Sequence, residues 1–370
     1  MNFKLKIAIS LLSTLLFLSC GGGGESSSHS TQSSTPQKLQ PPKEGIYFGA
    51  FPDFGGSEDI VTKTRVKKFE KLIDKNLLWA CFSQNWYSGV EYPQKAIDEI
   101  SSQGVVPYVR LMPRSDEEQF HSEELFTMQN IIDGKFDKEL HQWAIDAKDD
   151  GTPLLLDFAV EMNGEWFSWS GVFNGKGTKN LYGDPTYYDG AERYRDAYRH
   201  IIDIFREEDV RNITWFFHAN INSQPNEEWN QPKYYYPGDD YIDWVGVSLY
   251  GAMNSEEDYW ESFEEILESR YQSILDISDD KPFALLEFGV TDGNPLGDKA
   301  EWLSGAFETI LEGDYIEFSA ISYWHENWEE ESGAEATIRV DSSAESLETF
   351  RRYVADETFV SEAQFGSLSR

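Results

Sequence analysis

The sequence predicts an α/β fold, a single (β/α)8 barrel over residues 45–360, preceded by an N-terminal leader. Eight short apolar runs alternate with longer amphipathic segments along this range. The 370 residues leave room for a barrel of about 250 residues and the leader. A doubly wound open sheet is the alternative fold, but no apolar run is followed by a Gly-rich phosphate-binding loop.

The eight strand-like runs are short and rich in β-branched and aromatic residues, as expected for buried parallel strands. They occupy residues 45–51, 77–83, 105–112, 154–161, 213–219, 244–250, 283–288 and 318–324. The helical segments have apolar residues at three- and four-residue spacing. They occupy residues 63–75, 93–103, 138–148, 191–207, 258–277 and 299–311.

Residues 1–19 have the pattern of an export signal. Two lysines precede an apolar run at residues 7–18, which is too short to span a bilayer comfortably. The segment LFLSC, ending at Cys20, resembles a bacterial lipoprotein signal, in which cleavage leaves a lipidated N-terminal cysteine. We therefore expect an exported protein with Cys20 as its lipid anchor, attached to a bacterial membrane, with the outer membrane and the cell surface as candidate locations. Simple secretion is the alternative.

The segment that follows, residues 20–44, is rich in Gly, Ser, Thr and Pro and has no apolar periodicity. Such a composition predicts a flexible linker, which would hold a globular domain away from the membrane. No later stretch reaches about 18 apolar residues, so we expect membrane contact only through the lipid.

The charge and the motifs that are absent exclude several classes of function. The formal net charge of −35 repels phosphate backbones, which argues against nucleic acid as a partner. The sequence has no HExxH or CxxC zinc motif, no Walker loop and no G-x-S-x-G elbow. We therefore expect no metal and no cofactor. We also expect a monomer, and an inert buried thiol at Cys81.

Two glutamates stand where barrel enzymes carry their chemistry, at the C-terminal ends of the strands. Glu161 ends the fourth predicted strand and Glu287 lies at the end of the seventh. Such a pair fits retaining glycoside hydrolysis, in which the two carboxyl groups stand about 5 to 5.5 Å apart. For either glutamate alone, a structural ion pair is the alternative.

Other polar and aromatic residues gather at the same strand ends and in the loops that follow them. Aromatic rings stack on the faces of sugar rings, which indicates a neutral polysaccharide as the partner. The candidate substrate-binding residues are Arg110, Asn163, Trp166, Trp169, His218, Tyr250 and Trp324.

Retaining chemistry needs one protonated and one ionised carboxyl group. Barrel geometry places Arg110 and Tyr250 nearest to Glu287 as hydrogen-bond donors. We expect Arg110 to hold Glu287 charged and oriented.

Three segments resemble motifs of glycoside hydrolase family 26, which contains β-mannanases and related endo-β-glycanases. DFAVEMNGEWFSWSG at 157–171 resembles the acid/base motif, YPGDDYIDWVGVSLY at 236–250 the strand-six signature, and KPFALLEFGV at 281–290 the nucleophile segment. They occur in the family's order, and the resemblance extends from about residue 45 to residue 354.

The resemblance implies a (β/α)8 barrel that hydrolyses β-glycosidic bonds with retention and without a metal. By position, Glu161 becomes the general acid/base and Glu287 the nucleophile. Tyr250 would donate a hydrogen bond to the nucleophile, and Trp324 would form the floor of the sugar site beside the scissile bond.

One position departs from the family's mannanases. They typically carry a histidine just before the acid/base, whereas this chain has Val160, which cannot hydrogen-bond a sugar hydroxyl. β-1,4-Mannan remains the expected substrate, and mixed-linkage β-1,3-1,4-glucan and β-1,3-xylan are the alternatives within the family. A non-catalytic glycan-binding surface lipoprotein is the alternative of another class. The presence of both glutamates argues against it.

Overall fold

The computed structural model describes residues 37–56, 58–329 and 333–367. The predicted signal peptide (1–19), the lipid anchor Cys20 and the predicted linker as far as residue 36 lie outside the described residues.

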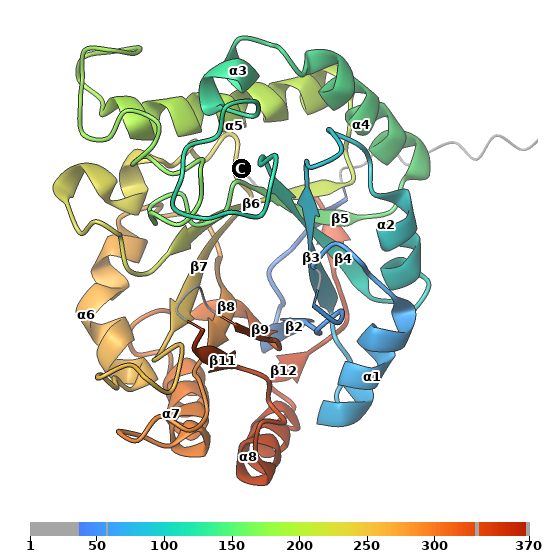
Figure 1. Ribbon diagram of the computed structural model, residues 1–370. Coiled ribbons are helices and arrows are strands. Elements are labelled where there is room, and N and C mark those ends of the chain that lie inside the picture. Colours follow the sequence, from blue (N-terminus) through green and yellow to red (C-terminus); the bar gives the residue numbers. More distant parts are fainter. Residues whose placement is uncertain (1–36, 57, 330–332, 368–370) are drawn as a thin grey trace, which may run out of the picture. The chain divides into compact units, whose positions relative to one another are not determined.

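Eight parallel strands form a closed barrel (Figure 1). Each strand pairs with the next along the chain, and pairing between the first and the last closes the ring. The predicted barrel is therefore confirmed. The strands are β2 (Ile46–Phe51), β3 (Trp79–Asn85), β4 (Val106–Met112), β5 (Leu154–Phe158), β6 (Ile213–Asn220), β7 (Trp244–Tyr250), β8 (Phe283–Gly289) and β9 (Phe318–Trp324).

Helices surround the strands in Figure 1, and each helix has buried apolar side chains. No helix among the described residues is both long and apolar enough to cross a bilayer. The helices are α1 (Lys63–Ile73), α2 (Gln94–Ser101), α3 (Met128–Ile132), α4 (Asp137–Asp150), α5 (Asp189–Glu207), α6 (Phe263–Leu275), α7 (Lys299–Glu312) and α8 (Ala344–Val354), with the short 3-10 turns η1 (Glu228–Asn230) and η2 (Pro232–Tyr234).

Local capping signals explain the helix boundaries. The segment expected to be helical from residue 258 begins its helix only at Phe263, because Ser262 and Glu265 form a capping box at that point. Helices α4 and α7 end at Gly151 and Gly313, which adopt the left-handed conformation that suits glycine.

Large aromatic side chains fill the barrel interior near the ends where the strands begin. Trp79 packs edge-on against Tyr108 at 5.9 Å, and Phe216 stacks on Trp244 at 5.6 Å. The Trp79 indole also donates to Ser322 Oγ at 3.2 Å. A side chain at position 49 would collide with this indole, so glycine is required there. This packed layer supports the strand ends that carry the polar residues.

A second small sheet seals the end of the barrel where the strands begin. Strand β1 (Lys38–Leu39) pairs antiparallel with β13 (Phe365–Gly366), while β12 (Phe359–Val360) pairs with the start of β2. The fully buried Leu39 donates its N–H to Thr214 Oγ1 at 2.8 Å, and its carbonyl accepts from the Trp244 indole at 3.0 Å. The last part of the predicted linker is therefore ordered and packs against the barrel.

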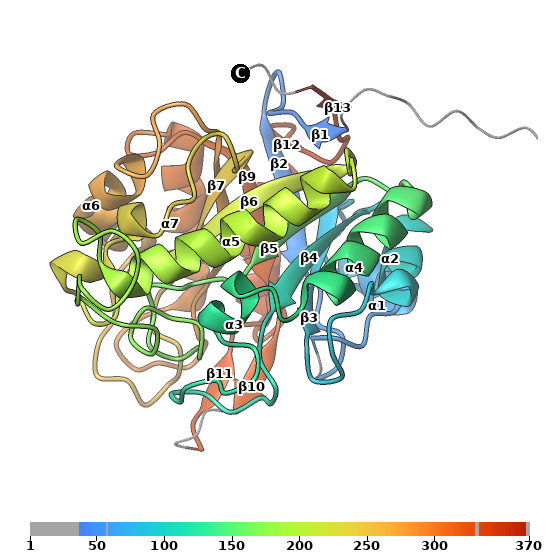
Figure 2. The same ribbon diagram turned by 90° about the horizontal axis from the view of Figure 1, so that it is seen from above.

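Figure 2 shows this β1–β13 sheet and the hairpin of β10 (Asn327–Glu329) and β11 (Glu335–Thr337) at opposite ends of the barrel. The hairpin follows β9, at the end where Glu161 and Glu287 lie. Lys299 anchors the chain after β11 through hydrogen bonds to the carbonyls of Thr337 and Arg339.

Leu39→Ala is expected to lower the free energy of unfolding by about 2 to 4 kcal/mol, because it empties a fully buried site. The exposed Lys43→Ala variant is the control and should change it by less than about 0.5 kcal/mol. Urea denaturation followed by circular dichroism measures both. Equal effects of the two variants would show that residues 38–39 do not pack against the barrel in solution.

Candidate active site

The acid/base candidate Glu161 lies on a tight turn just beyond β5. The strand ends at Phe158, three residues earlier than expected, because Ala159 and Glu161 have left-handed φ values of 52° and 54°. The Glu161 N–H still donates to the His218 carbonyl on β6 at 2.8 Å, which ties the turn to the barrel. Such strain in residues other than glycine is typical of functional sites.

Two donors orient the Glu161 carboxyl group, which is 8% exposed. Trp166 Nε1 donates to Oε2 at 2.9 Å and Asn220 Nδ2 donates to Oε1 at 2.8 Å. Asn163 in turn braces Asn220: its Oδ1 accepts the Asn220 N–H at 2.9 Å, and its Nδ2 donates to the Asn220 carbonyl at 2.8 Å. Asn163 is fully buried, so Asn220 is the amide that reaches the carboxyl group.

The nucleophile candidate Glu287 lies on β8 and is 7% exposed. Arg110 Nη1, from β4, donates to Oε1 at 2.6 Å, and the Tyr250 hydroxyl, from β7, donates to Oε2 at 2.9 Å. Both expected donors are therefore in contact with Glu287. Burial raises the pKa of Glu287 to about 7; Arg110 lowers this pKa and the nearby Glu161 raises it.

The same arginine has a second acidic partner that the sequence analysis did not identify. Arg110 Nη2 lies 3.3 Å from Glu58 Oε2, in the loop between β2 and α1. The Ser83 hydroxyl, on β3, also donates to Glu58. Glu326 is a further buried acid, with a pKa raised to about 8 by burial and by Glu58, while a hydrogen bond with Trp324 lowers it. Only the position of Glu58 after a strand end could have indicated its role.

Trp324, which was expected to form the floor of the sugar site, lies beside Arg110. Its indole is 5% exposed and stacks on Phe51 at 4.0 Å. The Arg110 guanidinium carbon lies 4.6 Å from the Trp324 ring centroid. The indole therefore helps to position Arg110.

Two more of the expected substrate-binding residues are buried and hydrogen-bonded to protein groups. Trp169 Nε1 donates to the Val160 carbonyl at 2.7 Å, next to the acid/base turn. The ring nitrogens of His218 lie 3.0 Å from Asp157 Oδ2 and 2.8 Å from Ser248 Oγ. The structure thus places these side chains in support of the carboxyl pair, whereas Trp166 and Tyr250 are partly exposed beside it.

Residues that could hold a metal lie on an exposed loop. Among the described residues, the ligand atoms of Asp116, Glu118 and His121 lie within 4.8 Å of one another. His121 Nε2 is already 3.1 Å from Asp116 Oδ1, and its Nδ1 is 3.0 Å from the Ser122 carbonyl. Glu161 and Glu287 are not part of this group.

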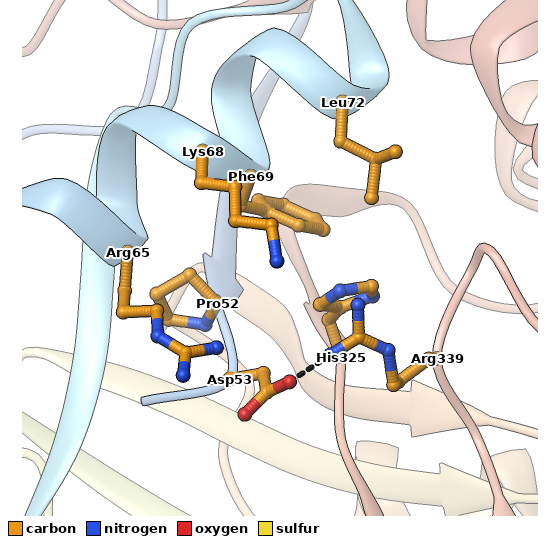
Figure 3. Close-up of a pocket in the computed structure, with 8 residues that line it drawn as sticks. All are labelled: Pro52, Asp53, Arg65, Lys68, Phe69, Leu72, His325 and Arg339. Carbon is orange, nitrogen blue, oxygen red and sulfur yellow. Dashed lines mark hydrogen bonds and ion pairs between the residues drawn. The ribbon is translucent and has the colours of Figure 1, made fainter. Parts of the chain in front are cut away.

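A small pocket lies between α1 and the segment after β9, and it is separate from the carboxyl pair (Figure 3). An ion pair between Arg339 and Asp53 crosses it, and the Phe69 ring packs on His325 at 4.6 Å. His325 Nδ1 accepts the Val340 N–H at 3.0 Å, and burial lowers the pKa of His325 to about 3. These contacts hold the segment that follows Trp324 against α1 and the loop after β2.

The geometry assembles two carboxyl groups at one end of a barrel, close enough that Glu161 affects the ionisation of Glu287. One carboxyl group is paired with a buried cation and a phenol, and the other with an indole and an amide. This arrangement can supply a nucleophile and a proton donor to the same bond.

Comparisons with known proteins agree with the fold and the motifs. The sequence model for glycosyl hydrolase family 26 matches residues 117–276. Endoglucanase H of Acetivibrio thermocellus is 26% identical over 320 residues, which cover 86% of this chain and 31% of that protein. A mannan endo-1,4-beta-mannosidase of Bifidobacterium adolescentis is 28% identical over 132 residues, covering 34% of this chain and 12% of that protein. The chain thus spans less than a third of either relative.

A solved beta-mannanase of this family from Bacteroides ovatus has the same fold, with a TM-score of 0.56, 18% identity, and coverage of 86% of this chain and 90% of that chain. This likeness shows the fold, and the match of the family model shows that residues 117–276, which include the acid/base segment, are similar to glycosyl hydrolase family 26.

Proposed function

We propose that the protein is a retaining endo-β-glycanase whose substrate is β-1,4-mannan. The observation that carries the proposal is the pair Glu161 and Glu287, with Arg110 and Tyr250 both bonded to the second carboxyl group. The names of a relative and of a structural neighbour, a mannan endo-1,4-beta-mannosidase and a beta-mannanase, support mannan as the substrate.

The reaction proceeds by double displacement. Glu287 attacks the anomeric carbon while Glu161 gives its proton to the leaving glycosidic oxygen, which forms a glycosyl-enzyme ester. Glu161 then removes a proton from water, and the water's oxygen displaces Glu287. Arg110 and Tyr250 hold the two oxygens of Glu287, so that the carboxylate is oriented before the sugar arrives.

Mixed-linkage β-1,3-1,4-glucan is the second candidate substrate. The relative whose match covers 86% of this chain is named an endoglucanase. The Val160 side chain is buried and apolar, so it offers no hydrogen bond to the hydroxyl that distinguishes mannose from glucose. β-1,3-Xylan is a third candidate within the family.

We further propose that the protein is a monomer, exported and lipid-anchored to a bacterial membrane through Cys20, with the outer membrane and the cell surface as candidate locations. The support is the signal-like sequence of residues 1–20 and the Gly/Ser/Pro-rich composition that follows.

Product analysis separates the substrates. The chain from residue 21 is incubated in parallel with β-mannan, barley mixed-linkage glucan and β-1,3-xylan, and the released oligosaccharides are identified by chromatography. We expect mannooligosaccharides, and a loss of release of at least about 10³-fold in Glu161→Gln and Glu287→Gln. Glucooligosaccharides alone would transfer the assignment to glucan. Binding of a β-glycan with no release from any of the three would favour a glycan-binding protein.

The pH dependence tests the state of the nucleophile. Glu287 must be ionised to attack, and its pKa is raised to about 7 by burial, so kcat/KM is expected to fall on the acid side with a midpoint near pH 7. Arg110→Ala removes the cation that lowers this pKa, so the midpoint should move at least about one unit to higher pH. Arg352→Ala, an exposed change on α8, is the control. An unmoved midpoint in Arg110→Ala would overturn this role.

Cell fractionation tests the anchor. In a bacterial host that lipidates exported proteins, the full chain should be found with the membranes. Cys20→Ala should release it or leave it uncleaved, and Cys81→Ala, which alters the buried thiol, should not change its distribution. Metabolic labelling with a fatty acid identifies the modified protein. A full chain that is unlabelled and soluble outside the cell would establish simple secretion.

A further inference from the structure

Two carboxylates share the guanidinium of Arg110. Nη1 lies 2.6 Å from Glu287 Oε1 and Nη2 lies 3.3 Å from Glu58 Oε2. The Arg110 side chain is buried, and among the described residues its Nε has no hydrogen-bond partner. The orientation of the guanidinium therefore depends on these two carboxylates and on the Trp324 ring at 4.6 Å.

Glu58 is fixed to a strand of the barrel and does not move freely with its loop. The Ser83 hydroxyl on β3 donates to the same oxygen, Oε2, that accepts from Arg110. The backbone makes a second link, because the Ser83 N–H donates to the Glu58 carbonyl at 3.2 Å. With 28% of its side chain exposed, Glu58 is the partly solvated partner of a buried cation. This ion pair differs from one between two exposed groups, which contributes little to the stability of a protein.

The carboxylate of Glu58 therefore offsets part of the positive charge of Arg110 that acts on Glu287. Burial of Glu287 opposes the ionisation of its carboxyl group. The other titratable groups that face Arg110, Glu287 or Glu58 are Glu161 and Asp157 from β5 and its turn, His218 from β6, Tyr250 from β7, Glu326 after β9, Cys81 from β3, Tyr87 after β3 and Asp59 in the β2–α1 loop.

We infer that Glu58 is a positioning residue: by holding one arm of the Arg110 guanidinium, it sets both the orientation of the arginine and the share of its charge that reaches the nucleophile Glu287. The inference deepens the proposed function and rests on it, because it assigns Glu58 to the tuning of Glu287 as a nucleophile. Glu58 itself need not touch the substrate.

Glu58→Gln keeps the size of the side chain and removes its charge. Arg110 then acts on Glu287 without compensation, so the acidic midpoint of kcat/KM is expected to move at least about 0.5 unit to lower pH. The plateau above the midpoint should fall about two- to tenfold, because a less basic carboxylate is a weaker nucleophile. Glu58→Asp keeps the charge and should leave the midpoint within about 0.2 unit of the wild-type value.

The control is Glu256→Gln, which removes one exposed negative charge from the loop after β7. Its midpoint should coincide with that of the unaltered protein. A merely structural role for Glu58 would lower the melting temperature or kcat/KM without moving the midpoint. A midpoint that stays in place in Glu58→Gln, or moves equally in Glu256→Gln, overturns the inference.

A readout without turnover separates this inference from the proposed function. With glutamate labelled by ¹³C at the carboxyl carbon, NMR follows the titration of Glu287, whose signal is assigned by its loss in Glu287→Gln. The full chain should show a lower titration midpoint in Glu58→Gln than in the unaltered protein. If no β-glycan is hydrolysed but this shift occurs, the proposed function fails and the Glu58 contact stands. If hydrolysis occurs without a shift, only the Glu58 inference fails.

Discussion

The buried contact between Arg110 and Glu287 is the interaction on which the rest of the site depends. Removing a carboxylate and a guanidinium from water is costly, and only close, well-oriented partners offset that cost. Here the two groups meet at 2.6 Å, and the Tyr250 hydroxyl occupies the other carboxylate oxygen. Because these residues come from three strands, β4, β7 and β8, the contact exists only when the barrel is closed.

Packing in the barrel interior and beside Arg110 holds this contact in place. Layers of aromatic side chains fill the interior, and Leu39 seals the end where the strands begin. At the other end, Trp324 stacks on Phe51 and lies against Arg110. The left-handed turn at Glu161 then brings the second carboxyl group to the same place. Rigid support of this kind lets the reactive groups keep their geometry before substrate binds.

Much of this could be predicted from the sequence, because strand patterns and local motifs are read along the chain. All eight barrel strands lie within a few residues of their expected positions, and Arg110 and Tyr250 contact Glu287 as expected. Contacts across the fold could not be predicted in this way. Glu58 and Asn220 touch the site through loop and strand-end geometry, and Leu39 lies in a segment whose composition indicates a linker. Asn163 lies beyond the end of β5 and His218 near the end of β6, but nothing in their spacing shows that they are buried.

Trapping of the glycosyl-enzyme tests the central claim most directly. A 2-deoxy-2-fluoro sugar with a good leaving group slows the second displacement, so the covalent ester accumulates and can be located by mass spectrometry of proteolytic peptides. The account predicts one added sugar on the peptide that contains Glu287, and none in Glu287→Gln. A sugar attached to a different residue, or a first-formed product of inverted configuration, would contradict it.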